Sequence, residues 1–211
     1  MPVPYLTVRD VTEHEIEVRH SRFICALAPV DSEDAAREFV AGRKRRWSDA
    51  THNCSAYVIG AQPGHSGAQK ADDDGEPGGT AGTPMLEVLS RRGYADVAAV
   101  VTRYFGGVLL GAGGLARAYG GAVSETLDRA ESVRMIPARV VRVTADHAQA
   151  GRLESDLRAS PYALRHVDYG DRVTFEVNVA LDGVPGFEEW LATATAGRAV
   201  PSLGEHVHVA E

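Results

Sequence analysis

The sequence has 211 residues, of which 44% are hydrophobic and 24% are charged. This length fits one large domain or two small ones, and the apolar content excludes a disordered chain. The formal net charge of -7 at pH 7 excludes a generally basic nucleic-acid-binding protein. Any contact with RNA is therefore expected to be local and to depend on a few residues.

Two cysteines, Cys25 and Cys54, do not make a disulfide framework, and we expect both to be buried strand residues. No apolar segment follows a basic start near the N-terminus, and no run of about 18 apolar residues occurs. We therefore expect no signal peptide, no membrane span and no membrane partner, and a cytoplasmic location.

The first third of the chain predicts a strand-rich unit with one helix. Residues 16–18 and 23–28 predict two strands joined by a turn. A helix is expected next, with Asp31-Ser32 at its N-cap and the basic cluster Arg43–Arg46 at its C-terminal end. Residues 54–59 predict a further strand.

Residues 60–82 contain seven glycines and four acids, and their composition predicts a long loop that is either functional or disordered. Thr83 and Pro84 are expected to begin a helix, with Thr83 as its N-cap. An almost continuous apolar run at residues 95–102 predicts a central strand.

The second half of the chain contains a predicted domain boundary. Apolar residues recur at three- and four-residue steps from Leu115 to Ala130, which predicts a long helix. Residues 132–138 show no periodicity, so we divide the chain into an N-terminal domain of residues 1–136 and a C-terminal domain of residues 137–211. Beyond the boundary, the order β-α-β-β-α-β predicts a ferredoxin-like domain.

The first candidate site is a glycine-rich turn between the strand near Thr102 and the long helix. Free backbone N–H groups and the positive end of a helix attract phosphate or carboxylate, and arginine side chains can add charge-assisted hydrogen bonds. The alternative is that the glycines only permit tight packing of strand against helix. The candidate ligand-binding residues are Arg103, Tyr104, Gly106, Gly107, Gly111, Gly113, Gly114 and Arg117.

The second candidate site is the acidic segment at residues 72–84. Dense carboxylates could bind Mg²⁺ or Ca²⁺, but the EF-hand spacing is absent, and a solvated acidic loop is the favoured interpretation. The glycines at residues 79–82 could form a second anion-binding turn that faces the first. The candidate ligand-binding residues here are Asp74, Glu76, Thr80 and Gly82.

Two weaker candidates lie nearby. His52 could act as a general base for Cys54, although a structural role is favoured because no third partner is apparent. The cluster Arg43–Arg46 beside Trp47 could contact RNA, although a solvated helix end is favoured. We keep His52 among the ligand-binding candidates, assign no catalytic residue, and expect neither a metal nor a cofactor.

Four motifs resemble the IMPACT/YigZ family and occur in the family's order. They are Ser21-Arg22-Phe23, Thr51–Tyr57, Asp73–Pro84 and Arg103–Tyr119. The resemblance implies an α+β fold: an N-terminal ribosomal-protein-like domain with a left-handed βαβ unit, then a ferredoxin-like domain. It also implies a connection with translation, because eukaryotic members act in translational control under amino-acid starvation. One departure is Leu109, where many members carry a lysine.

Three functions follow from these observations. The favoured one is a regulator of translation, connected with a stress response, that binds RNA, the ribosome or a translation factor through the glycine-rich face. The second is an enzyme acting on a phosphorylated or carboxylate small molecule held by the two glycine-rich turns. The third is an adaptor that binds proteins through its ferredoxin-like domain. The first two require the turns to converge beside Arg103 and Arg117 in a positively biased pocket. The oligomeric state stays open.

Overall fold

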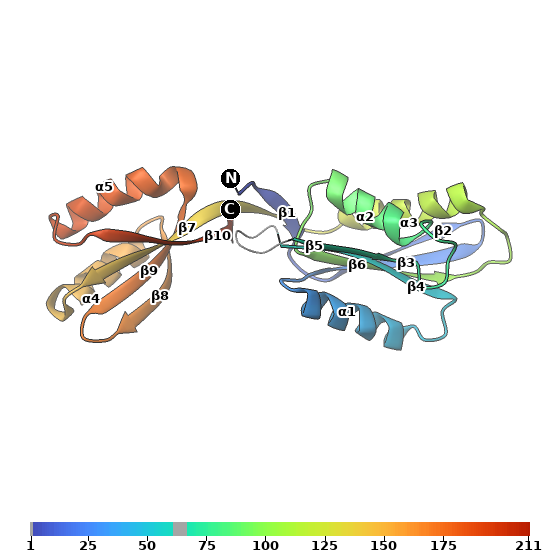
Figure 1. Ribbon diagram of the computed structural model, residues 1–211, viewed down its shortest axis with the longest axis horizontal. Helices are drawn as coiled ribbons and strands as arrows, with labels where there is room; N and C mark the ends of the chain where they lie inside the picture. The colour runs from blue at the N-terminus through green and yellow to red at the C-terminus, as the bar shows by residue number, and fades with distance from the viewer. Residues whose placement is uncertain (1, 61–66) are drawn as a thin grey trace. The chain divides into compact units, whose positions relative to one another are not determined.

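The computed structural model describes residues 2–60 and 67–211, which form two compact units (Figure 1). One unit is Tyr5–Arg134, and the other combines Met135–Glu211 with the first residues of the chain up to Pro4. Each unit combines helices with an antiparallel sheet. The predicted two-domain α+β fold is confirmed.

The N-terminal unit is built on a five-stranded sheet in the order β2-β3-β6-β4-β5. Its strands are β2 (Thr12–Val18), β3 (Ser21–Pro29), β4 (His52–Ile59), β5 (Ala68–Asp72) and β6 (Val97–Tyr104), and a short strand, β1 (Tyr5–Val8), precedes them. Neighbouring strands of this sheet are antiparallel, so β3 and β4 run parallel on either side of β6. The helix between them, α1 (Glu33–Arg46), completes a βαβ unit.

Helices cover both faces of this sheet. Helix α1 packs on one face, while α2 (Gly82–Arg91) and α3 (Ala112–Leu127) pack on the other (Figure 1). Strand β6 is buried along almost its whole length because it is the central strand between two helical layers, as its apolar run predicts. The predicted apolar stripe of α3 is buried against the sheet, with Tyr119 and Val123 fully covered.

The structure confirms one predicted helix cap and changes another. Ser32 caps α1, because its Oγ accepts a hydrogen bond from the Ala35 N–H at 3.2 Å. Helix α2 begins at Gly82, so the prediction of Thr83 as its N-cap is wrong. Ala81 holds the N-cap position, and its side chain makes no capping hydrogen bond. The carboxylate of Asp73 accepts the N–H groups at this helix end instead.

Part of the predicted long loop is a strand. Strand β5 pairs with β4 over residues 68–72, so the expectation of irregular structure is wrong there, while residues 61–66 lie outside the described part of the chain. The strand escaped prediction because it lies at the edge of the sheet. Gln69 and Lys70 are exposed, and no alternation of apolar residues marks it.

The C-terminal unit has the predicted ferredoxin-like order, with its strands in the sheet order β8-β9-β7-β10. Its elements are β7 (Ser132–Ala145), α4 (His147–Ala159), β8 (Ala163–Tyr169), β9 (Val173–Ala180), a 3₁₀ turn (Leu181–Gly183), α5 (Val184–Thr195) and β10 (Pro201–Ala210). All three neighbouring pairs are antiparallel. Strands with a helix between them are therefore separated by one antiparallel strand, as in a split βαβ arrangement.

Strand β7 runs through residues 132–138, where the sequence predicts the domain boundary. Pro137 lies within it, opposite His208 of β10. On the other side, the pairing of β7 with β9 begins only at Ala138. Proline has no N–H to donate, and this position suits it because it lies just outside the ladder between β7 and β9.

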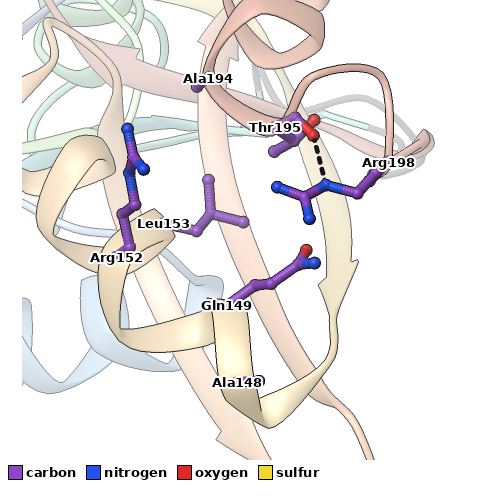
Figure 2. A pocket seen from close by; sticks show the side chains of 7 residues that line it. All are labelled: Ala148, Gln149, Arg152, Leu153, Ala194, Thr195 and Arg198. Carbon is purple, nitrogen blue, oxygen red and sulfur yellow. Dashed lines mark hydrogen bonds between the residues drawn. The ribbon is translucent and has the colours of Figure 1, made fainter.

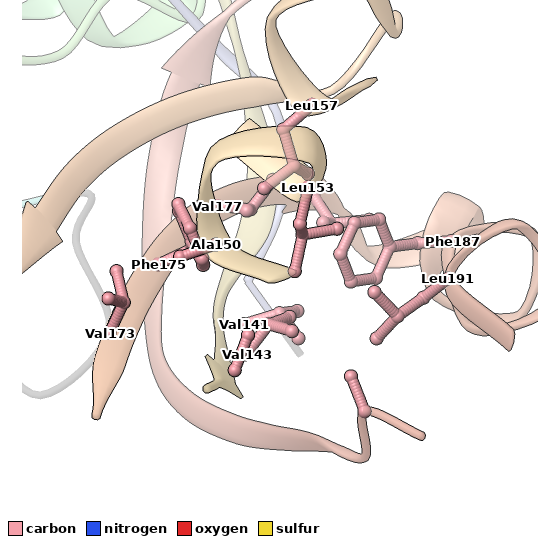
Figure 3. Packing of buried hydrophobic residues seen from close by; sticks show 13 residues of the cluster. Val141, Val143, Ala150, Leu153, Leu157, Val173, Phe175, Val177, Phe187 and Leu191 are labelled. Atoms are coloured by element: carbon pink, nitrogen blue, oxygen red, sulfur yellow. The ribbon is translucent and has the colours of Figure 1, made fainter. Parts of the chain in front are cut away.

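The core of the C-terminal unit lies between its sheet and its two helices (Figure 3). Alternate residues of β7 and β9 face inward, and leucines of α4 with Phe187 and Leu191 of α5 close over them. Phe187 is fully buried and its ring lies against those of Tyr162 and Trp190, with centroids 4.8 and 5.8 Å away. This packing makes Phe187 the side chain whose loss should cost most.

Replacing Phe187 with alanine should lower the free energy of unfolding of the C-terminal unit by about 3–5 kcal/mol, because a large cavity would remain. Urea denaturation followed by Trp190 fluorescence, in a Trp47→Phe background, measures this change. Val200→Ala is the control, since Val200 is 79% exposed. A loss for Phe187→Ala as small as that of the control would contradict the described core.

Candidate functional site

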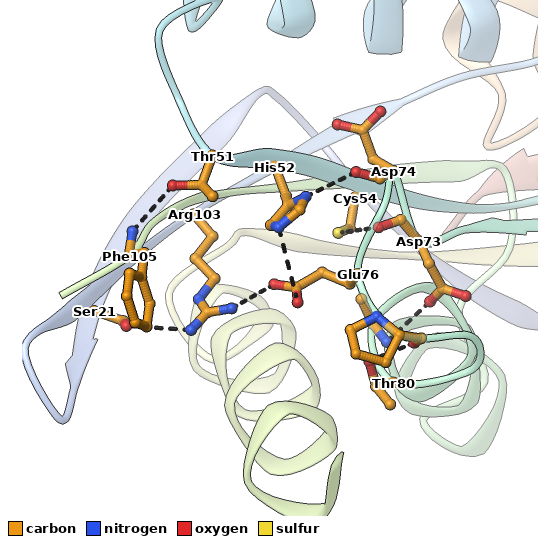
Figure 4. Close-up of polar contacts among 12 residues, drawn as sticks. Ser21, Thr51, His52, Cys54, Asp73, Asp74, Glu76, Thr80, Arg103 and Phe105 are labelled. Atoms are coloured by element: carbon orange, nitrogen blue, oxygen red, sulfur yellow. Dashed lines mark hydrogen bonds and ion pairs between the residues drawn. The ribbon is translucent and has the colours of Figure 1, made fainter. Parts of the chain in front are cut away.

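The carboxylate of Glu76 lies at the centre of a buried polar cluster in the N-terminal unit (Figure 4). Its Oε1 accepts hydrogen bonds from Arg103 Nη1 and from the Tyr119 hydroxyl, both at 2.7 Å. The side chains of Glu76 and Arg103 are only 3% and 6% exposed. A charge this buried is costly unless it is paired, so each side chain of the pair requires the other.

Aromatic rings enclose the guanidinium of Arg103. Its Cζ lies 5.4 Å from the ring centroid of Phe23 and 5.5 Å from that of Phe105. Its Nη2 lies 3.4 Å from Ser21 Oγ. The guanidinium thus makes its main contacts within the protein, through these cation–π contacts and the ion pair with Glu76. Arg103 is therefore a structural cation of the site rather than a free contact for an anion.

His52 stands beside this pair because strand register places it opposite Arg103 on neighbouring strands. Its Nδ1 lies 2.8 Å from the backbone oxygen of Asp74. A carbonyl oxygen can only accept, so Nδ1 carries a proton and donates it. The other ring nitrogen, Nε2, then faces Glu76 Oε2 at 3.9 Å. This arrangement fixes the orientation of the imidazole toward the carboxylate.

Asp73 caps helix α2 from a distance in the sequence. Its Oδ1 accepts hydrogen bonds from the N–H groups of Ala81 and Gly82, and its Oδ2 from that of Gly79, all between 2.7 and 3.0 Å. Burial alone would raise the pKa of Asp73, but these three hydrogen bonds outweigh it and lower the pKa below the usual 3.8. The carboxylate stays charged and stabilises the positive end of the helix.

The favoured interpretation of a solvated acidic loop is wrong, because the neighbouring aspartates are also used inside the unit. Asp74 pairs with Lys44 and accepts the N–H of Asn53, both at 2.6 Å. Asp72 Oδ1 accepts the N–H of Asp74. Among the described residues, no group of three or more His, Cys, Asp or Glu side chains is placed to hold a metal ion.

A cavity of about 450 Å³, here called the N-terminal groove, opens over the Glu76–Arg103 pair. Thr51, His52, Glu76 and Arg103 supply its polar part. Its other lining residues are Gly75, Pro77, Phe105, Leu109, Leu110, Gly111, Ala112 and Leu115. Leu109 and Phe105 are 83% and 47% exposed, so the rim of the groove is apolar and accessible.

The two predicted arginines do not share a site. Arg117 is exposed and lines a separate pocket of about 360 Å³ with Arg19 and Gly114. On helix α3, Leu115 faces the N-terminal groove while Arg117 does not. The expected positively biased pocket between Arg103 and Arg117 is therefore wrong, because one guanidinium is neutralised and the other lies elsewhere.

Several predicted glycines have a packing role. A Cβ at Gly106 would lie 2.0 Å from the backbone oxygen of His20, and one at Gly82 would lie 2.5 Å from the nitrogen of Asp72. Gly107 and Gly111 adopt positive φ angles of 85° and 71°, which favour glycine. At Gly113, a Cβ would lie 3.5 Å from Arg117 Nη1. Tight packing thus explains Gly106 and Gly82 without a ligand.

The other polar candidates bond within the unit. The Tyr104 hydroxyl donates to Asp49 at 2.9 Å, and the Thr80 hydroxyl donates to the backbone oxygen of Pro77 at 2.6 Å. Of the predicted ligand-binding residues, the structure brings four together at the N-terminal groove. These are His52, Glu76, Arg103 and Gly111. Ligand binding by any of the predicted residues stays a prediction.

The two weaker candidates are the pair His52 and Cys54 and the basic cluster Arg43–Arg46. Cys54 is fully buried, its thiol donates to the backbone oxygen of Asp73, and burial raises its pKa to about 12. A thiol that stays protonated is a poor nucleophile, which agrees with the structural role favoured for this pair. In the basic cluster, Arg43 is buried against Glu13 at 2.6 Å and Lys44 pairs with Asp74. Arg45 and Arg46 are exposed, as a solvated helix end predicts, whereas the burial of Arg43 and the pairing of Lys44 depart from that interpretation.

Sequence reasoning missed the apolar rim and the cap. Phe105 continues the alternation of β6, which places it on the same side as Arg103, so the pattern Thr-Arg-Tyr-Phe contained a usable signal. In the sequence, Leu109 is notable only because many family members carry a lysine there, and its pattern does not predict an apolar contact. No local signal marks Asp73 as the cap of α2, because its partners lie six to nine residues further on.

Replacing Asp73 with alanine should lower the free energy of unfolding of the N-terminal unit by about 2 kcal/mol near neutral pH, because three N–H groups lose their acceptor. Folding lowers the pKa of Asp73 below its usual value of 3.8. The stability that the charged carboxylate contributes is therefore fully present above pH 3.8 and is lost as the pH falls through the pKa of the folded state. Urea denaturation of both proteins at several pH values measures the difference.

The difference between Asp73→Ala and the unaltered protein should therefore narrow in acid. Asp171→Ala is the control, because Asp171 is exposed in the turn between β8 and β9. A stability difference that is the same at every pH, or no difference near neutral pH, would show that the Asp73 carboxylate does not cap α2.

Both units match known protein families. The Impact N-terminal domain matches residues 19–127, and a domain of unknown function (DUF1949) matches residues 143–198. IMPACT family member YvyE of Bacillus subtilis (strain 168) is 47% identical, over 95% of this chain and 91% of its own length. IMPACT family member YigZ of Escherichia coli (strain K12) is 38% identical, over 86% and 88% of the two chains.

A solved structure supports the same relationship. A crystal structure described as that of a hypothetical protein is 35% identical, covers 97% of this chain and 99% of its own, and superposes with a TM-score of 0.72. In the part of the chain that the structure describes, no helix combines the length and apolar content needed to cross a membrane. With one domain match over half of the sequence and relatives aligned along nearly all of it, the chain belongs to the IMPACT family.

Proposed function

We propose that this protein regulates translation by binding a protein of the translation machinery in the N-terminal groove. Membership of the IMPACT family supports the connection with translation, since the family resemblance connects eukaryotic members with translational control. The observation that carries the choice of site is the apolar rim. Phe105 and Leu109 line the groove and are 47% and 83% exposed, and Val108 of the same loop is 39% exposed beside them in the sequence.

An apolar rim of this kind favours a protein partner. Clustered exposed hydrophobic side chains mark interaction sites, and aromatic residues at such sites contribute strongly to binding. The floor of the groove offers two acceptors, Glu76 Oε2 and His52 Nε2, because Oε1 is already used by Arg103 and Tyr119. The expected partner segment therefore presents apolar side chains around one hydrogen-bond donor.

The same geometry argues against RNA at this site. Binding to a nucleic acid backbone needs cations that are free to contact phosphates. Arg103 is buried against Glu76, and Arg43 and Lys44 are paired with carboxylates. The net charge of -7 further disfavours a general attraction to RNA. A cytoplasmic location and a part in a stress response stay predictions from the sequence.

A second candidate is an enzyme or receptor for a small carboxylate or phosphorylated molecule. It is favoured by the size of the groove, about 450 Å³, which falls within the usual range of small-molecule sites, and by the fixed His52–Glu76 geometry. A thermal-shift screen of metabolites separates the two candidates, because a saturating small ligand stabilises the folded protein while a protein-binding surface gives no such shift.

Replacing Leu109 with aspartate should abolish recovery of the partner, because a charge would be placed in the centre of an apolar contact. The experiment isolates the tagged full-length protein from growing cells and identifies co-purified ribosomal proteins and translation factors by mass spectrometry. Val11→Asp is the matched control, since Val11 is a 61% exposed valine of the same unit outside the groove.

We expect the unaltered protein and Val11→Asp to recover the same translation proteins, with and without ribonuclease treatment. Leu109→Asp should recover none of them at a comparable level. Equal recovery by Leu109→Asp would refute the groove as the binding site. Complete loss after ribonuclease treatment would instead indicate an RNA target.

A further inference from the structure

The C-terminal unit contains a small pocket between the start of α4 and the end of α5 (Figure 2). Its volume is about 220 Å³, and its buried lining includes Leu153 and Thr195. The pocket is lined by Ala148, Gln149, Arg152, Leu153, Ala194, Thr195 and Arg198. Two arginines and no acidic residue therefore meet at one cavity, in a chain whose net charge is negative.

Arg198 is held in place by the backbone. Its Nε donates to the carbonyl oxygen of Thr195 at 3.1 Å, which leaves the two Nη groups toward Gln149 (Figure 2). The chain reaches this position through Ala196 and Gly197, whose φ angles of 50° and 73° are left-handed. Among the described residues, no carboxylate lies within ion-pair distance of Arg198.

Most of the other arginines of this unit are neutralised by carboxylates. Four of them pair with carboxylates at 3.0 Å or less: Arg142 with Glu176, Arg158 with Glu154, Arg165 with Glu205 and Arg172 with Asp146. Arg152, the second arginine of the pocket, has only a long contact of 3.8 Å with Asp156 and is 86% exposed. A third, Arg139, also lacks a carboxylate partner among the described residues and instead donates to the backbone oxygen of Gly204 at 2.6 Å. Of the three arginines without a close carboxylate in the described part of this unit, the other two therefore line the same cavity.

The start of α4 adds further donors. Asp146 holds its N-cap position, but its side chain makes no cap bond and instead pairs with Arg172. The Gln149 N–H already donates to the backbone oxygen of Asp146 at 2.9 Å, whereas the Ala148 N–H has no hydrogen bond among the described residues, as is usual at the start of a helix. Ala148 and Gln149 of this first turn line the pocket. The positive end of α4 therefore supplements the two arginines.

We propose that this pocket binds the terminal phosphate group of a small phosphate monoester. A carboxylate offers two oxygens, whereas a terminal phosphate offers three and carries nearly two charges, which suits two guanidinium groups, an amide and backbone N–H groups. The cavity is smaller than pockets that enclose whole ligands, so the phosphate enters and the rest of the molecule stays outside. This proposal does not rest on the function of the N-terminal groove.

The test titrates inorganic phosphate, and separately glycerol 3-phosphate, into the full-length protein at constant ionic strength while amide NMR spectra are recorded. We expect saturable shifts confined to the backbone of residues 147–153 and 194–199. Arg198→Gln should weaken both affinities by about tenfold or more, because charge-assisted hydrogen bonds are lost. Arg152→Gln should weaken them as well.

Arg165→Gln is the matched control, because it removes an exposed arginine of the same unit that pairs with Glu205 outside the pocket. It should bind as the unaltered protein does. Shifts that never saturate, or affinities unchanged in both pocket variants, would overturn the proposal. So would equal binding of an RNA without terminal phosphates, whose diesters offer only two free oxygens each. In the spectra of the variants, unchanged amide signals from residues outside the pocket verify that each variant is folded.

Discussion

The N-terminal site depends on one buried ion pair. Glu76 and Arg103 lie almost wholly out of contact with water, and removal of either would leave a charge that the interior cannot solvate. Tyr119 donates to the same carboxylate oxygen, so the segment after β5, strand β6 and helix α3 meet at one group. His52 faces the same carboxylate at 3.9 Å, and the ring of Phe105 lies against the guanidinium of Arg103.

The pair also decides what kind of chemistry the groove offers. A free arginine beside a glycine-rich turn would attract anions, but neutralisation by Glu76 removes that attraction and leaves an apolar rim over a polar floor without an unpaired cation. The C-terminal pocket shows the opposite condition, since Arg152 reaches a carboxylate only at 3.8 Å and Arg198 reaches none among the described residues. Pairing, rather than the mere presence of arginine, therefore separates the two sites.

Local pattern made much of the fold predictable, including the apolar run of β6, the stripe of α3 and the ferredoxin-like order. Long-range geometry did not follow from local pattern. The pairing of Glu76 with Arg103 spans 27 residues and depends on the register of β4 against β6. Similarly, Arg103 and Arg117 belong to one motif, but a strand and a helix direct them to different cavities.

A double-mutant cycle on Glu76 and Arg103 tests the central claim most directly. Unfolding of Glu76→Ala, Arg103→Ala and the double variant in urea would be followed by Trp47 fluorescence in a Trp190→Phe background. Each single change should cost about 3–5 kcal/mol, because a buried charge loses its partner. The double variant should cost less than the sum by about 2 kcal/mol or more; costs that add to within about 0.5 kcal/mol would contradict the account.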